Sequence, residues 1–111
     1  MINIKIIPLS VNECWQGIRY KTPKYNKYQN DLLLLLPQIE LPKAPYSVII
    51  EFGLRNKLND IDNSLKPFLD ILSKKYGFND NEIYHLQVFK KVVPKGESYI
   101  KFRIETFNFI L

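Results

Sequence analysis

The sequence predicts an α+β fold: a single small domain over residues 1–111, with the element order β-α-β-α-β-β and a mixed sheet on which the helices pack. A chain of 111 residues is too short to split into two halves that would each bury enough apolar surface. Its 46% hydrophobic and 14% aromatic content is ample for a core, whereas a disordered chain is poor in both. Segments of strand-like and helix-like composition follow one another in the stated order.

The first half of the chain predicts one strand, an ordered loop and one helix. Residues 2–7 alternate in the manner of a half-buried strand, which Pro8 ends. Residues 8–24 mix proline, glycine and polar residues with aromatic and basic side chains, which is typical of an ordered loop. Good helix formers over residues 25–36 predict a helix that Pro37 stops, although the consecutive leucines in it would also suit a buried strand.

The second half predicts three further strands. Residues 46–54 are rich in β-branched and aromatic side chains and predict a strand covered on both faces. Residues 83–93 and 98–107 predict two more strands, and the sequence Pro-Lys-Gly-Glu at residues 94–97 is a plausible hairpin turn between them.

A second helix is expected between these strands, because apolar side chains recur at helical spacing at Leu65, Phe68, Leu69 and Leu72. Gly77 is a stop signal just beyond this pattern. Pro67 belongs near the first turn, since deeper in a helix it would remove a hydrogen bond and clash with the preceding turn. The helix is therefore expected to begin close to Asp62 or Asn63.

The composition excludes several classes of site. A formal charge of +5 and a pI near 9.3 indicate an anionic partner, for which nucleic acid is the first candidate. The lone cysteine, Cys14, cannot form an internal disulfide, so we expect a reducing, cytoplasmic environment. With His85 it makes a poor zinc set, because structural zinc generally takes about four nitrogen or sulfur ligands, and both residues are expected to be structural.

No membrane partner or secretory signal is expected. Lys5 interrupts the first apolar run and Pro8 ends it before any apolar segment of useful length. The leucine run is far shorter than the roughly 20 apolar residues that span a bilayer.

Acidic residues are concentrated in one part of this basic chain, at Asp60, Asp62, Asp70, Asp80 and Glu82. Asp60 and Asp62 lie two apart in the expected extended approach to the second helix, where alternate side chains project to the same side. Mg²⁺ takes carboxylate ligands while keeping positions for water and phosphate, and it would remove their repulsion. Asp80 can add a third ligand if the chain returns past the start of the helix.

The same residues have structural explanations. Asp60 or Asp62 would serve equally well as helix caps, and Asp80 as a turn residue. Lys66, one turn after Asp62, would lie on the same helix face and reach a phosphate oxygen, with Asp70 extending that stripe by one turn. The alternative for Lys66 is an ordinary surface ion pair, worth only about 0.3 to 0.5 kcal/mol.

Two stretches of the sequence resemble the RusA family of Holliday junction resolvases. The first is Asp60-Ile-Asp62-Asn63-x-x-Lys66-x-x-x-Asp70-x-Leu72, and the second is Gly77-Phe78-Asn79-Asp80-x-x-Ile83. The resemblance extends upstream to Pro8-Leu9-Ser10-Val11-Asn12, Trp15, Arg19 and Tyr25. The chain departs from the family at Asn79, where relatives often have an aspartate, and in the segment between Asp70 and Gly77, which is about one residue longer than in some relatives.

The resemblance implies a Mg²⁺-dependent homodimeric endonuclease that resolves four-way DNA junctions by paired, symmetric phosphodiester hydrolysis. It also implies that Mn²⁺ can substitute for Mg²⁺. It implies that Asp60, Asp62 and Asp80 bind metal, with Glu82 as the substitute for Asp80, and that Lys66 is a catalytic residue at the scissile phosphate. A two-fold dimer suits a two-fold junction, since each subunit can present one site to one of two equivalent strands. The alternatives are a non-catalytic basic DNA-binding module and a nuclease that prefers flaps, forks or single strands.

Candidate DNA contacts lie mainly in the N-terminal loop, at Asn12, Trp15, Arg19, Lys21, Lys24 and Lys27. Trp15 or Tyr20 can stack on an unpaired base, while solvated surface charge is the alternative for each lysine. A second possible basic patch consists of Lys90, Lys91 and Lys95. The candidate dimer surfaces are the leucines at 32–36, for which core packing is the alternative, and the apolar group of Phe107, Phe109, Ile110 and Leu111.

Overall fold

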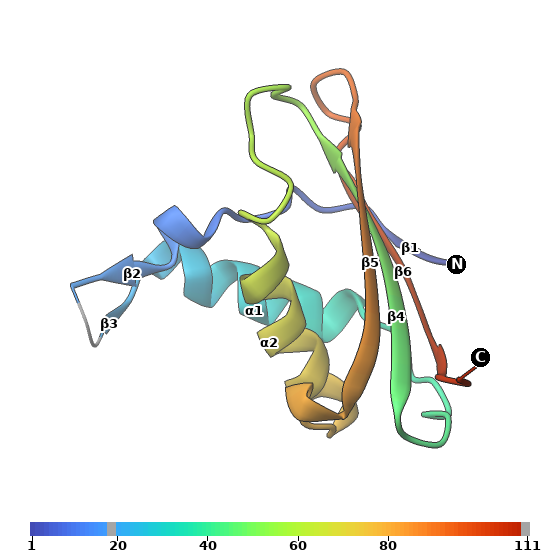
Figure 1. The fold of residues 1–111 in the computed structure, drawn as a ribbon. Helices are drawn as coiled ribbons and strands as arrows, with labels where there is room; N and C mark the ends of the chain where they lie inside the picture. The colour runs from blue at the N-terminus through green and yellow to red at the C-terminus, as the bar shows by residue number, and fades with distance from the viewer. Residues whose placement is uncertain (18–19, 110–111) are drawn as a thin grey trace.

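The computed structural model describes residues 1–17 and 20–109, and Figure 1 shows a sheet with both long helices on one of its faces. The four strands of this sheet lie in the order β1-β6-β4-β5. Their bounds are β1 (Ile2–Ile4), β4 (Tyr46–Leu54), β5 (Ile83–Val92) and β6 (Tyr99–Thr106). Because β4 is parallel to β5 and antiparallel to β6, the prediction of an α+β fold with a mixed sheet is confirmed.

The shorter elements lie next to the two helices in the sequence. The helices are α1 (Pro23–Leu35) and α2 (Leu65–Tyr76). A 3-10 turn η1 (Val11–Glu13) and a two-stranded hairpin of β2 (Trp15–Gln16) and β3 (Tyr20–Lys21) precede α1, and a second 3-10 turn η2 (Asp80–Glu82) follows α2. In Figure 1 the hairpin projects from the end of the helical layer, away from the sheet. Residues 8–24 are therefore more regular than the loop we expected.

The core lies between the sheet and the helices. On β4, alternate residues Val48, Ile50 and Phe52 are fully buried, as the strand period requires for the covered face. Their partners on β6 are also apolar, and the ring of Phe68 from α2 lies 6.0 Å from Phe52 and 5.6 Å from Phe102. The other fully buried apolar residues from the sheet and helices are Leu32, Pro67, Ile71, Leu72 and Ile100.

Side chains rather than helices bury the opposite face of β4. Gly53 lets the ring of Tyr99 on β6 cross the strand, since a Cβ atom at residue 53 would lie 2.4 Å from Tyr99 Cε1. The Tyr99 hydroxyl donates a hydrogen bond to Glu51 Oε2 at 2.6 Å. Burial and this contact with Glu51 raise the pKa of Tyr99 to about 12. The expectation that the strand is covered on both faces thus holds for a different reason on each face.

Helix α1 confirms the helical interpretation of the leucine run but starts at Pro23, before the expected residue 25. Thr22 Oγ1 accepts a hydrogen bond from Tyr25 N at 3.1 Å, so Thr22 is the N-cap and proline occupies the first helical position. The leucine side chains divide between core and solvent. Leu32 and Leu36 are buried one turn apart, whereas Leu34 and Leu35 are exposed.

Helix α2 ends as predicted but begins later than predicted. Its first residue is Leu65, and residues 61–64 form turns instead of the expected first helical residues. Pro67 consequently lies in the first turn, where its missing N–H leaves no helical bond unmade. Gly77 ends the helix with φ at 72° in the left-handed region, and its N–H donates to Ser73 O. No helix in residues 1–17 and 20–109 is long and apolar enough to cross a membrane.

Candidate active site

Lys66 joins the two stretches of sequence that carry the predicted site. Its Nζ lies 2.9 Å from Asp70 Oδ1, one helical turn away, and 3.4 Å from Asp80 Oδ2 at the start of η2. The chain after Gly77 therefore folds back along α2 and brings Asp80 to the exposed face of this helix. The expectation that Lys66 pairs along a helical stripe with Asp62 is wrong, because α2 begins only at Leu65, and Asp70 is its partner instead.

The two carboxylates keep Lys66 positively charged. The hydrogen bond and the charge of Asp70, followed by those of Asp80, raise the pKa of Lys66 above its ordinary value of 10.5. A protonated ammonium has no lone pair at neutral pH, so Lys66 cannot act as a general base. It can act as a fixed positive charge toward a phosphate oxygen.

Asp80 has one oxygen paired and one without a partner. Oδ2 faces Lys66, whereas Oδ1 is shielded from solvent and accepts no hydrogen bond from the described residues. A shielded carboxylate oxygen without a partner is unfavourable unless an ion or another donor completes it. Glu82 was predicted as the substitute for Asp80 in binding metal. Its Oε1 instead accepts a hydrogen bond from Asn79 N at 2.9 Å in a capping box.

Asp60 and Asp62 lie in consecutive tight turns, so the expected extended approach to α2 is wrong. Asn63 N donates to Asp60 O at 3.2 Å, and Leu65 N donates to Asp62 O at 3.1 Å. Both side chains are exposed and form no hydrogen bond or ion pair within residues 1–17 and 20–109. The N-cap of α2 is Ser64, which makes no side-chain capping bond. Neither aspartate therefore acts as the helix cap that was the alternative explanation.

The acidic side chains do not form a closed metal site in this conformation. Among the described residues, no three aspartate, glutamate, histidine or cysteine side chains lie close enough together to hold one metal ion. The donor chemistry nevertheless fits a hard divalent cation, because every candidate ligand is a carboxylate oxygen and Asp80 Oδ1 lacks a partner. Binding by all three predicted aspartates requires the turn that carries Asp60 and Asp62 to approach Asp80.

Lys90 on β5 holds the segment that leads to these aspartates, and sequence reasoning missed this role. Its Nζ donates to Lys57 O at 2.9 Å and to Asn59 O at 2.7 Å. The second carbonyl belongs to the residue immediately before Asp60. We predicted Lys90 as part of a basic patch with Lys91 and Lys95, but its ammonium group is partly buried against backbone carbonyls. No sequence signal marks such a bond, because any residue can supply a carbonyl.

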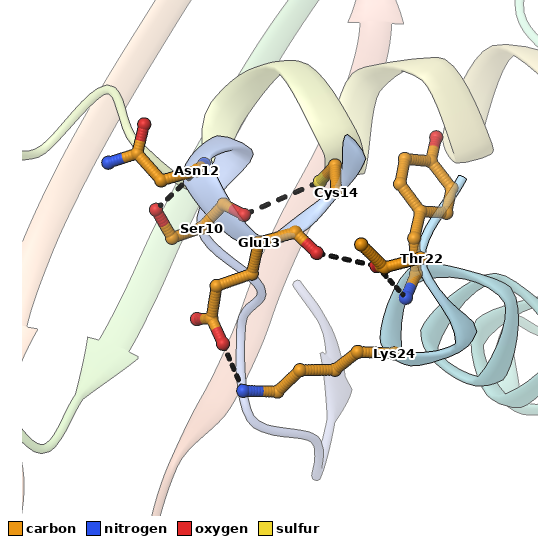
Figure 2. A network of polar contacts seen from close by, with 7 residues as sticks. Ser10, Asn12, Glu13, Cys14, Thr22 and Lys24 are labelled. Carbon is orange, nitrogen blue, oxygen red and sulfur yellow. Dashed lines mark hydrogen bonds and ion pairs between the residues drawn. The ribbon is translucent and has the colours of Figure 1, made fainter. Parts of the chain in front are cut away.

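The N-terminal loop lies against the acidic turn. Val11 N in η1 donates to Asn63 O at 2.7 Å, which places the segment containing Asn12 beside the residue that follows Asp62. Figure 2 shows how this loop is braced: Ser10 O accepts a hydrogen bond from Cys14 Sγ, and the Ser10 hydroxyl accepts one from Asn12 N. Asn12 itself is exposed.

The hairpin after this loop carries two of the predicted DNA contacts. Trp15 and Lys21 are directly opposite each other in its ladder, and both are exposed. Lys21 Nζ lies 5.1 Å from the ring centroid of Tyr25 and 3.5 Å from Gln29 Oε1. Arg19 lies outside the described residues.

The remaining basic residues of this region are neutralised by neighbours. Lys24 is paired with Glu13, as drawn in Figure 2. Lys27 Nζ lies 2.7 Å from Asp31 Oδ2, one helical turn away. Both lysines are exposed, so these pairs can exchange with a phosphate, but they are weaker candidates than Lys21.

Each of the two predicted dimer surfaces is exposed only in part. Leu34 is 85% exposed and Leu35 50%. At the C-terminus, the ring of Phe107 packs 4.7 Å from that of Phe109, which is exposed. The other two residues of that predicted group, Ile110 and Leu111, lie outside the described residues.

Cys14 and His85 have the structural roles we expected. Cys14 is fully buried at the base of the hairpin, where burial and then the charge of Glu13 raise the pKa of its thiol. Ser47 Oγ lies 2.5 Å from Nδ1 of His85 on the face of the sheet opposite the helices.

The sequence matches no model of a known protein family, and no curated protein is detectably similar to it.

Proposed function

We propose that this protein is a Mg²⁺-dependent, structure-selective endodeoxyribonuclease that resolves four-way DNA junctions, as its resemblance to the RusA family implies. The observation that carries the proposal is the 3.4 Å contact between Lys66 Nζ and Asp80 Oδ2. It brings together the two separate stretches of sequence on which the resemblance rests. Asp60 and Asp62 lie in the segment that contacts the N-terminal loop, where Asn63 O accepts a hydrogen bond from Val11 N.

The proposed chemistry divides between the carboxylates and the lysine. When bound, Mg²⁺ or Mn²⁺ supplies an activated water and neutralises charge on the phosphodiester. Asp60, Asp62 and Asp80 would hold the ion through oxygen atoms. Lys66 binds a phosphate oxygen and stabilises the negative charge that grows in the transition state, which its raised pKa suits it to do.

The proposal includes a homodimer in the cytoplasm. Two equivalent strands of a junction require two equivalent active sites, and a two-fold pair of subunits supplies them. The exposed leucines Leu34 and Leu35 offer an apolar contact for such a partner.

A cleavage assay with a synthetic four-way junction and Mg²⁺ tests the proposal. We expect paired nicks at symmetric positions of two opposed strands, abolished by EDTA and by Asp62→Asn. Flap, fork, single-stranded and linear duplex substrates, measured side by side, test the structure preference. The absence of cleavage, or cleavage that Asp62→Asn leaves undiminished, would contradict the proposal. Faster cutting of flaps or forks would identify that DNA, rather than the four-way junction, as the preferred substrate.

One observation favours a second candidate, a non-catalytic DNA-binding module. Among the described residues no three potential ligands are gathered for one metal ion, while β2 and β3 pair with Trp15 and Lys21 on one face. Such a module would bind junctions with a strong dependence on salt and would cut none of them with Mg²⁺ or Mn²⁺.

A further inference from the structure

The hairpin of β2 and β3 presents two different faces. Residues directly opposite each other in an antiparallel ladder share a face, and the pairs here are Trp15 with Lys21 and Gln16 with Tyr20. Trp15 and Lys21 therefore lie on one face and Tyr20 on the other. The two aromatic residues that the sequence offered as equivalent stacking groups are thus separated by the fold.

Within the described part of the hairpin, the face with Trp15 alone is backed by a further aromatic ring. The centroid of the Trp15 ring lies 6.1 Å from that of Tyr25, which is only 4% exposed in helix α1. Lys21 Nζ lies over the same Tyr25 ring at 5.1 Å. Trp15 remains 47% exposed, so part of the indole is supported by the protein while part is open to solvent. Tyr20 is 73% exposed.

Three polar contacts fix the base of the hairpin. Thr22 N donates to Cys14 O at 2.9 Å, and Thr22 Oγ1 donates to Glu13 O at 2.6 Å. Figure 2 shows the second of these contacts beside the pair of Glu13 with Lys24. The side chain of Cys14 is fully buried beneath them. Trp15 is therefore held in place before any ligand arrives, which reduces the entropy lost on binding.

The same face adjoins the candidate active site. After burial, the charge of Asp70 is the largest cause that raises the pKa of Tyr25, and the charge of Lys66 lowers it. Helix α2, which carries Asp70 and Lys66, contacts both α1 and η1, and Val11 N in η1 donates to Asn63 O at 2.7 Å just before α2. A nucleotide whose base stacks on Trp15 would therefore lie beside Lys21 and near the helix that carries Lys66.

We propose that Trp15, supported by Tyr25 and flanked by Lys21, forms a stacking platform for an unpaired base next to the phosphate at Lys66. The inference rests on the proposed DNA-cleaving function and adds to it a source of substrate selectivity. A base in continuous duplex is already stacked on its neighbours, whereas an unpaired base at a branch point has a free face. Stacking on an aromatic side chain needs no particular base, so the platform selects DNA structure rather than sequence.

Trp15 is the only tryptophan in the chain, so its fluorescence reports on the platform directly. The probe is a short oligothymidylate strand, titrated in EDTA so that no cleavage occurs. We expect the strand to quench the tryptophan emission on binding. An emission that stays constant while the anisotropy of a labelled strand shows binding would overturn the proposal.

Substitutions at matched positions make the test specific. By anisotropy, Trp15→Ala is expected to weaken binding of the single strand about 10- to 100-fold, Trp15→Phe to restore most of it, and Tyr20→Ala to bind like the wild type. The loss for Trp15→Ala should be larger for the single strand and the junction than for linear duplex. Equal losses on all three DNAs, or none on any, would contradict base stacking.

The cleavage assay separates this proposal from the proposed function. Junction cleavage by wild-type protein whose emission is not quenched overturns the platform alone. Quenching and the loss with Trp15→Ala, found in a protein that cuts nothing with Mg²⁺, support the platform and overturn the nuclease.

Discussion

Two pairs of carboxylates near helix α2 differ in their surroundings. Asp70 and Asp80 share the ammonium group of Lys66, at 2.9 Å and 3.4 Å. Asp60 and Asp62 are exposed, lie two residues apart and have no side-chain partner within the described residues. The first pair is organised by the protein itself, whereas the second keeps its negative charge uncompensated.

The difference separates what the fold needs from what a ligand would need. Unpaired like charges in a turn gain no stabilisation from a partner and repel each other, and the proposed cation would remove this repulsion. The contacts of Lys66 with Asp70 and Asp80, by contrast, join helix α2 to the turn η2. Changes in the unpaired aspartates should therefore affect activity alone, and changes around Lys66 should affect both activity and local structure.

The largest effect is expected for the unpaired pair. Asp62→Asn removes a proposed metal ligand and should lower junction cleavage by about 1,000-fold or more, because several kcal/mol of charge stabilisation are lost. Its free energy of unfolding should change by no more than about 0.5 kcal/mol, since the side chain has no partner to lose. Kinetics together with urea unfolding check both parts. A large loss of stability with little loss of activity would reverse the assignment.

The next effect is expected at Lys66. Lys66→Met should reduce cleavage about 100- to 1,000-fold by removing a positive charge at the phosphate. Stability should fall by only about 0 to 1 kcal/mol, because the ion pairs are largely exposed. Lys66→Arg keeps the charge and serves as the control. If Lys66→Met retained wild-type turnover, Lys66 would be merely a surface ion pair.

A smaller effect is expected from releasing the segment before the aspartates. Lys90→Met removes the hydrogen bonds to the carbonyls of Lys57 and Asn59 and should lower activity about 10-fold by loosening the turn. Hydrogen exchange of the amides at residues 57–63 should become faster. Lys91→Met, on the exposed neighbouring residue, is the matched control. Unchanged exchange in Lys90→Met would show that this lysine does not hold the turn.

The smallest effect is a shift in titration. Asp70 is the largest cause of the raised pKa of Lys66, so Asp70→Asn should lower that pKa toward 10.5. The pair stabilises the folded state fully below the unfolded-state pKa, and its contribution disappears as pH rises through the higher folded-state pKa. An NMR titration of the Lys66 side chain measures this shift. Asp31→Asn, which removes the partner of Lys27, should leave the Lys66 titration unchanged.

Sequence patterns predicted the elements whose burial or stop signals are local. The strand Tyr46–Leu54 has the predicted bounds because its apolar and β-branched residues are continuous, and Gly77 ends α2 through its left-handed backbone. The early start of α1 was readable from Thr22 and Pro23, a cap signal that we overlooked. The hairpin was not predicted, since strands of two residues have too short a pattern to recognise.

The site was predictable as a set of residues but not as an arrangement. The spacing named Lys66, Asp70 and Asp80, yet the turns at residues 61–64 move Asp62 off the helical stripe. The roles of Lys90 and of the Trp15 face depend on backbone carbonyls and on strand pairing, which only the folded chain defines.

The binding of Mn²⁺, followed by electron paramagnetic resonance of the free ion, tests most directly whether the unpaired aspartates and Asp80 form one metal site. The wild-type protein should bind Mn²⁺, and Asp62→Asn and Asp80→Asn should each weaken binding at least about 10-fold. Asp31→Asn, which changes a carboxylate already engaged in a helical ion pair with Lys27, should bind like the wild type. Equal binding by the wild type and Asp62→Asn, or no binding by the wild type, would contradict the account.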